Sequence, residues 1–195
     1  RFIAQSLAAY AKPTLPNRHI GEWCCGSGSH TGATLFNNKV TNCTTTRITI
    51  KEDGTLKKTV ASTIDIIKRK SAPTLLVNSQ PCTGGCSFNS INGRTEQGKE
   101  KIRTHLRLFD VLWDNFVLVV ATLDYSKGDR VLIEWPKGCH YWKLPKVRKF
   151  LNEYGCECTH FNCCHFGLVS CINGMPIKKP WTYGTNCKEI TSTFE

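Results

Sequence analysis

The spacing of hydrophobic residues along the chain follows two patterns, which separate predicted strands from predicted helices. Short runs of apolar or β-branched residues predict strands. These runs occupy residues 18–25, 44–50, 75–77 and 131–136. Apolar residues spaced three and four apart instead predict amphipathic helices over residues 96–126 and 144–154.

The remaining segments give weaker signals that fit the same alternation of strands and helices. They are a short helix over residues 1–10, a glycine turn over 26–32 that opens a helix to about residue 37, a short apolar element at 64–67, a strand and turn at 156–167, and a basic segment at 174–184 that leads to a final strand. Strands that alternate with helices favour a parallel sheet. We therefore expect an α/β fold, with a Rossmann-like, mostly parallel sheet and helices on both faces.

The length and charge of the chain narrow the classes of protein to which it can belong. Its 195 residues predict a single domain, 1–195, with a sizeable core. The formal net charge of +11, from 26 basic and 15 acidic residues, favours polyanionic partners, with nucleic acid first. The same excess of basic residues would also serve solubility alone. No run approaches the ~20 apolar residues of a membrane-spanning helix, so we expect no membrane partner.

The chain has twelve cysteines, an even number that would permit a secreted disulfide protein. Disulfide frameworks belong mainly to chains too short to build a core, which this chain is not. Its adjacent pairs, Cys24-Cys25 and Cys163-Cys164, match no familiar bridge pattern. We therefore expect a reducing, intracellular setting, such as the nucleus or another compartment that holds nucleic acid.

The segment 75–92 (LLVNSQPCTGGCSFNSIN) holds the strongest candidate for chemistry. Cys82 comes just after a predicted buried strand, with Pro81 before it and paired glycines behind it. In open α/β sheets the carboxyl edge, where such a loop lies, is where ligands bind. Cysteine is also a strong nucleophile once its pKa is lowered or a partner positions it. An ordinary loop cysteine with turn glycines is the alternative.

Two further turns fall where a nucleotide-like ligand could bind. Gly26 and Gly28 follow a predicted strand and precede a predicted helix, so backbone N–H groups would face the ligand. Glu52 follows the next strand, about twenty residues past the glycines, where an acid grips ribose hydroxyls. Both segments would also serve as plain turns.

Cysteine and histidine gather near the end of the chain and suggest a possible zinc site. Cys156, Cys158, His160 and Cys163 could supply the soft ligands that zinc prefers. The usual Cys-x-x-Cys knuckle is absent, however, and ordinary thiols on a strand explain the pattern as well. We therefore expect no metal, with zinc as the weaker alternative.

Four short motifs resemble, in this order, those of the cytosine-5 DNA methyltransferases, S-adenosylmethionine-dependent enzymes of the Rossmann-like class I type. The motifs are residues 22–28 (EWCCGSG), the pair Asp65-Ile66, residues 80–92 (QPCTGGCSFNSIN) and residues 133–136 (IEWP). A fainter similarity continues through Phe166-Gly167 and Lys178-Lys179.

The resemblance implies a chemistry and a set of residues for it. Cys82 would be the nucleophile that adds to cytosine C6, and Glu134 the acid that holds and protonates the ring. The target base must leave the duplex to reach them, which implies nucleic acid as partner. The implied residues for the cofactor S-adenosylmethionine are Glu22, Cys24, Gly26, Gly28, Glu52, Asp65 and Pro81. The implied residues for nucleic acid are Ser87, Asn92, Lys178 and Lys179.

The chain also departs from the family pattern. Thr83 replaces a glutamine after the nucleophile, and Trp135 replaces an asparagine after the acid. Only 28 residues follow Gly167, too few for a target-recognition domain, so a partner chain would have to supply one. Two hypotheses follow: an active cytosine methyltransferase, or a catalytically inactive module of that fold that binds nucleic acid or serves assembly.

Overall fold

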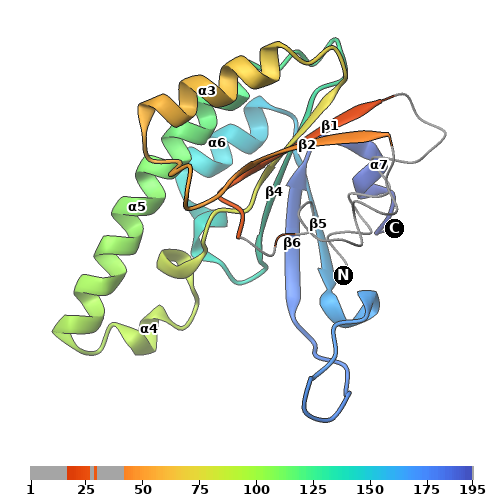
Figure 1. The fold of residues 1–195 in the computed structure, drawn as a ribbon. Coiled ribbons are helices and arrows are strands. Elements are labelled where there is room, and N and C mark those ends of the chain that lie inside the picture. Colours follow the sequence, from red (N-terminus) through yellow and green to blue (C-terminus); the bar gives the residue numbers. More distant parts are fainter. Residues whose placement is uncertain (1–16, 27–28, 30–41, 195) are drawn as a thin grey trace.

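The computed structural model describes residues 17–26, 29 and 42–194 and is built on one six-stranded sheet (Figure 1). The strands lie in the order β2-β1-β3-β4-β6-β5. Their bounds are β1 Arg18–Trp23, β2 Cys43–Ile48, β3 Thr74–Asn78, β4 Arg130–Pro136, β5 Glu157–Asn162 and β6 Pro180–Thr185. The predicted α/β class is confirmed, and each predicted strand in the described residues overlaps an observed one.

The sheet is mixed. Strands β2, β1, β3 and β4 pair in parallel, whereas β6 pairs antiparallel with both β4 and β5. Parallel neighbours need a crossover connection, usually a helix. The connection from β5 to β6 instead folds into its own hairpin, with Ser170 N donating to Met175 O, so β6 returns beside β5 in the opposite direction. The expectation of a mostly parallel sheet is therefore wrong for β5 and β6, which form the antiparallel side of the sheet.

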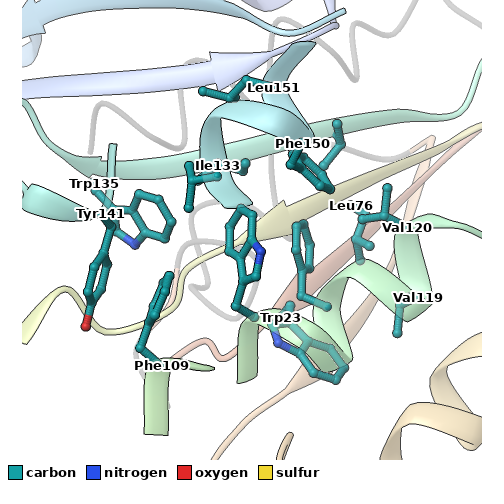
Figure 2. Packing of buried hydrophobic residues seen from close by; sticks show 14 of the residues in the cluster. Trp23, Leu76, Phe109, Val119, Val120, Ile133, Trp135, Tyr141, Phe150 and Leu151 are labelled. Carbon is teal, nitrogen blue, oxygen red and sulfur yellow. The ribbon is translucent and has the colours of Figure 1, made fainter. Parts of the chain in front are cut away.

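Three helices cover one face of the sheet, and their shared core is visible in Figure 2. These three are α3 Lys57–Lys68, α5 Glu96–Val120 and α6 Pro145–Glu153. The other described helices are the short α4 Asn89–Asn92 and α7 Lys188–Thr191, and 3₁₀ turns lie at Thr83–Gly85, His140–Lys143 and Cys163–Phe166. Apolar residues of α3, α5 and α6 pack together against Trp23, Leu76 and Ile133 of the sheet. Ile190 of α7 packs on the other face.

Aromatic rings dominate the core on the helical face. The ring centroids of Phe109 and Tyr141 are 3.7 Å apart, and Trp113 stacks on Phe109 at 5.8 Å. Trp135 lies edge-on to Tyr141 at 5.3 Å (Figure 2). This cluster joins α5 to the loop after β4, so it fixes the loops that leave the carboxyl edge of the sheet.

The helix predictions were accurate at their starts and less so at their ends. Helix α5 begins where predicted because the Thr95 hydroxyl accepts a hydrogen bond from Gly98 N, which caps the first turn. It ends at Val120, six residues earlier than predicted. The short apolar element at 64–67 proves to be part of the longer helix α3. The predicted helices over 1–10 and after the glycine turn lie outside the described residues, and no described helix is both long and apolar enough to cross a membrane.

A buried histidine on β1 predicts a loss of stability in acid. His19 is fully buried, its Nδ1 pairs with Thr44 Oγ1 at 2.8 Å, and burial, with Lys70 adding to it, lowers its pKa to about 4. The folded protein therefore holds a neutral imidazole, and stability is lost as pH falls from about 6.5 to about 4. Urea unfolding across that range measures the free energy of unfolding. Its fall in acid should be smaller in His19→Gln than in the parent chain, by on the order of 2 kcal/mol. The same substitution at exposed His140 should leave the pH dependence unchanged; an equal effect of both would contradict this.

Candidate active site

The parallel strands place a topological switch point between β1 and β3. Strand β2 lies beyond β1 and β4 beyond β3, so the connections from the two central strands leave in opposite directions. Such a point opens a crevice at the carboxyl edge of the sheet. Ser79 N, just past β3, donates to Trp23 O at the end of β1 at 2.9 Å, which holds the two exits together.

Glu134 reaches this edge from β4. Its carboxylate accepts a hydrogen bond from Trp181 Nε1 at 3.3 Å across the antiparallel pair of β4 and β6. Burial raises the pKa of Glu134 to about 7, while hydrogen bonds from Ser79 and Trp181 oppose the rise and the charge of Glu22 adds to it. The acid therefore exists partly protonated near neutral pH, as a general acid must.

Cys82 lies on the neighbouring loop, immediately before the 3₁₀ turn Thr83–Gly85. Burial raises the pKa of its thiol, Cys86 and the Glu134 carboxylate raise it further, and Lys179 lowers it. Lys179 likewise lowers the pKa of Glu134. Cys82, Glu134 and Lys179 thus lie within electrostatic reach of one another, so the structure brings the two predicted catalytic side chains to the same edge of the sheet.

The paired glycines behind Cys82 are required by close packing. A Cβ on Gly84 would lie 2.5 Å from Tyr141 Oη, and one on Gly85 would lie 2.7 Å from both Cys139 Sγ and Tyr141 Cδ1. Both contacts are closer than real Cβ atoms approach, and Tyr141 is itself fixed in the aromatic core. The Cys82 loop is therefore seated directly on that core.

This packing predicts that Gly85→Ala destabilises the protein. The added methyl must displace Tyr141 or Cys139, and overpacking of this kind costs about 1–3 kcal/mol. Urea unfolding measures the loss. Gly26→Ala is the matched control, because a Cβ there meets no atom of the described residues within 4 Å, and it should leave the free energy of unfolding unchanged. Equal stability of both variants would contradict the described packing of the loop.

A buried ionic network stands at the end of β1. Glu22, with 2 % of its surface exposed, accepts a hydrogen bond from Ser29 Oγ at 2.6 Å and lies 3.8 Å from Arg47 Nε. Arg47, opposite Glu22 on β2, also donates to Ser29 Oγ and to the Gly26 carbonyl. Sequence reasoning missed Arg47 and Ser29, since only the register of β1 and β2 brings them to Glu22.

The other predicted cofactor residues divide into two groups. Cys24 directly follows β1 and has a left-handed backbone (φ 60°). Glu52 lies in the turn after β2, where it accepts hydrogen bonds from Thr49. Both residues therefore lie at the carboxyl edge of the sheet. Pro81 is exposed there beside Cys82. Asp65 is exposed near the end of α3, which leads back to the amino end of β3, so the structure does not bring it to this edge. Gly28 lies outside the described residues.

The predicted nucleic-acid residues lie in two segments, one after β3 and one just before β6. Ser87 adjoins Gly138 of the loop after β4, where an added Cβ would be 3.7 Å from Ser87 Oγ. Asn92 ends α4 and lines a hollow of about 380 Å³ together with Lys101 and His105. Lys179 lies over the Trp181 ring at 4.4 Å, and Lys178 is exposed beside it.

The cysteine and histidine cluster forms no metal site in the described part of the chain. No group of three potential ligands there is close enough to hold an ion. Cys156 precedes the edge strand β5, which carries Cys158 and His160, and His160 pairs with Thr182. Cys163 is buried in the core of the opposite face. All twelve cysteines are free.

Comparison with known proteins gives no family for this chain. No protein-family model matches it. No curated protein matches it either.

Proposed function

We propose that this protein is an S-adenosylmethionine-dependent methyltransferase that acts on cytosine in nucleic acid, with Cys82 as nucleophile. The observation that supports this most strongly is that Cys82 and Glu134 both lie at the carboxyl ends of parallel strands and both have their pKa influenced by the charge of Lys179. A thiol, a carboxylic acid of raised pKa and a cation are the groups that this reaction needs.

The fold supports the proposal at the level of architecture. Strands β2, β1, β3 and β4 form a parallel set with a switch point, as in Rossmann-like enzymes. The reversed strand β6 lies outside this set; its Trp181, and Lys179 just before it, both influence Glu134. We place the protein in the class I methyltransferase type on these grounds, and expect it in a compartment that holds nucleic acid.

The residues at the end of β1 suit the cofactor. Among the residues that the structure describes, no atom lies within 4 Å of a Cβ added at Gly26, which leaves room there for a ligand to approach the backbone. Glu52, at the end of the adjacent strand, presents a carboxylate for ribose hydroxyls at the same edge. Glu22, Cys24 and Pro81 border the same space in the proposal. When bound, S-adenosylmethionine supplies the electrophilic methyl group.

The chain's own residues would activate the cytosine. Cys82 loses its proton and its sulfur adds to C6 of the ring, which makes C5 nucleophilic. Glu134, protonated, donates to N3 and stabilises the charge that develops. Lys179 lowers the pKa of Cys82 and so favours the reactive thiolate. Once C5 has bonded to the methyl group, its proton passes to solvent water, the C5–C6 double bond re-forms and the Cys82 thiolate leaves.

Cofactor binding is the first test. Calorimetry with S-adenosylhomocysteine should show binding that weakens at least about tenfold in Glu52→Gln, which loses one charge-assisted contact. Glu157→Gln, an exposed acid on β5, is the matched control and should bind normally. Absence of any binding by the parent chain would contradict the proposal.

A second candidate function is nucleic-acid binding without catalysis. The observation that favours it is the raised pKa of Cys82, because a neutral thiol is a poor nucleophile. Under this alternative, nucleic-acid affinity would be salt-sensitive while cofactor binding and methyl transfer would both be absent.

A further inference from the structure

One tryptophan side chain contacts two ionisable side chains of the candidate site. Trp181 lies on β6, where it pairs in register with Pro136 at the end of the neighbouring strand β4 (Figure 1). Its indole Nε1 donates a hydrogen bond to Glu134 Oε2 at 3.3 Å, and Lys179 Nζ lies over its ring at 4.4 Å from the centroid. We propose that Trp181 is the positioning residue of this site, with its N–H orienting the Glu134 carboxyl group and its ring seating Lys179. This role rests on the proposed function, in which Glu134 is the acid.

The backbone around Trp181 is held on both sides of its strand. Phe161 of β5 lies opposite it in register, and Lys137 N donates to the Pro180 carbonyl at 3.1 Å, one residue before it. The indole is half-buried and packs against the core on the face that carries α7. A glutamate side chain has a broad range of orientations about its last bond. A carboxyl group bonded to a fixed indole therefore takes its orientation from the indole.

The indole N–H also determines which oxygen of Glu134 carries the proton. A neutral carboxylic acid has a hydroxyl that donates and a carbonyl oxygen that accepts, whereas an indole N–H is a donor only. Trp181 therefore binds the carbonyl oxygen and leaves the hydroxyl to face away from it. Ser79, which also bonds to Glu134, both donates and accepts and so cannot make this choice. The free hydroxyl is the group that donates to the cytosine ring in the proposed reaction.

The ring face of Trp181 holds the cation of the site. An ammonium group over an indole is attracted by the negative charge of the π-face. Lys179 belongs to no ion pair within the described part of the chain. Its charge nevertheless lowers the pKa of both Cys82 and Glu134. Because lysine is a point charge on a flexible stem, seating by the ring is what keeps this charge near both groups.

The hydrogen bond from Trp181 is distinct from the charges around Glu134. The ionisable groups next to Glu134 on the neighbouring elements are Glu22, Cys82, Cys163, Lys179 and Tyr183. The indole is neutral, and its hydrogen bond favours the ionised carboxylate, so it lowers the pKa of Glu134 against the rise that burial causes. Removal of the indole N–H therefore raises the pKa of Glu134 without adding or removing a charge.

The orienting role is tested by infrared spectroscopy of the full chain, without cofactor or nucleic acid. The band of the protonated carboxyl group, assigned by its loss in Glu134→Gln, should disappear in the parent chain as pH rises through about 7. In Trp181→Phe, which keeps a ring but loses the N–H donor, it should persist to a pH higher by about 1 unit. Trp142→Phe loses an indole N–H that donates to the Pro136 carbonyl, so it is the matched control and should titrate as the parent. An unmoved titration in Trp181→Phe would overturn the orienting role.

The seating role is tested by the rate at which iodoacetamide alkylates Cys82, located by peptide mass spectrometry. Trp181→Phe retains a ring for Lys179 and should react close to the parent rate. Trp181→Met fills part of the same space but offers no π-face, so its rate should fall as in Lys179→Met, by about threefold or more. Cys158, exposed on β5, is the internal reference and should react equally in every variant. Equal Cys82 rates in Trp181→Met and the parent chain would overturn the seating role.

Both measurements are independent of methyl transfer, so they separate the role of Trp181 from the proposed function. A shifted titration in a chain that never transfers a methyl group would contradict the proposed function and support the contacts of Trp181. In a chain that does transfer methyl groups, the alkaline fall in rate should move to the same higher pH in Trp181→Phe, while the affinity for S-adenosylhomocysteine stays that of the parent. A fall that does not move would support the function and overturn the positioning role.

Discussion

Cys82→Ala should abolish methyl transfer to cytosine, with a loss of about 10³-fold or more in rate, because no other group can add to C6 in its place. The side chain is only half-buried and alanine fits the loop, so the fold and the affinity for S-adenosylhomocysteine should be retained. The measurement is transfer of a labelled methyl group to a cytosine-containing duplex, in parallel with calorimetry.

Cys86→Ala is the matched control for the nucleophile. Cys86 lies on the same loop, four residues later, and its thiol is also half-buried. It should retain most of the parent rate. Equal losses in the two variants would show that the loop, and not the Cys82 sulfur, is what the reaction needs.

Glu134→Gln should lower the rate by about 10²-fold to 10³-fold, the usual contribution of a positioned general acid. In the parent chain the reactive form of Glu134 is protonated, and that form is lost as pH rises through about 7. The alkaline fall in rate that follows from this should therefore be missing in the variant. Rate against pH, from about 5.5 to 9, is the measurement, and Glu153→Gln on α6 serves as the exposed control.

The same substitution should change stability in a pH-dependent way. The folded pKa of Glu134, about 7, lies above the ordinary value of 4.5, so the folded protein binds its proton more tightly than the unfolded chain. Stability due to this group is therefore full below pH 4.5 and falls as pH rises through 7. In the parent chain the free energy of unfolding should therefore fall by on the order of 2 kcal/mol as pH rises from 4.5 to above 7, and Glu134→Gln should remove that fall. A pH-independent difference would contradict the burial of the acid.

The central strands could be predicted because each is a continuous apolar run, as buried parallel strands are. Residues 75–77 and 131–133 are examples, and both proved to be fully buried. The sequence pattern revealed helix α3 only at Ile64–Ile67, since lysine, threonine and serine make up half of its twelve residues and interrupt its apolar face. The direction of β6 was not predictable, because the pattern of a strand does not encode which way it runs.

The candidate site shows a similar division. Cys82 and Glu134 could be singled out because each follows or ends a strand with a recognisable local sequence. Their surroundings could not, because Trp181 lies 47 residues from Glu134 and reaches it only through the pairing of β4 with β6. The family resemblance alone assigned Asp65 to the site. In the structure Asp65 lies near the end of helix α3, which leads to the amino ends of the strands and not to their carboxyl ends.

The most direct test of the central proposal is covalent trapping. A duplex that contains 5-fluorocytosine, incubated with the protein and S-adenosylmethionine, should form a stable adduct, because fluorine at C5 cannot leave as the proton does. Peptide mass spectrometry should locate the adduct on Cys82, and Cys82→Ala should form none. An adduct on another cysteine, or no adduct at all under conditions in which the cofactor binds, would contradict the assignment of Cys82 and Glu134 as a catalytic pair.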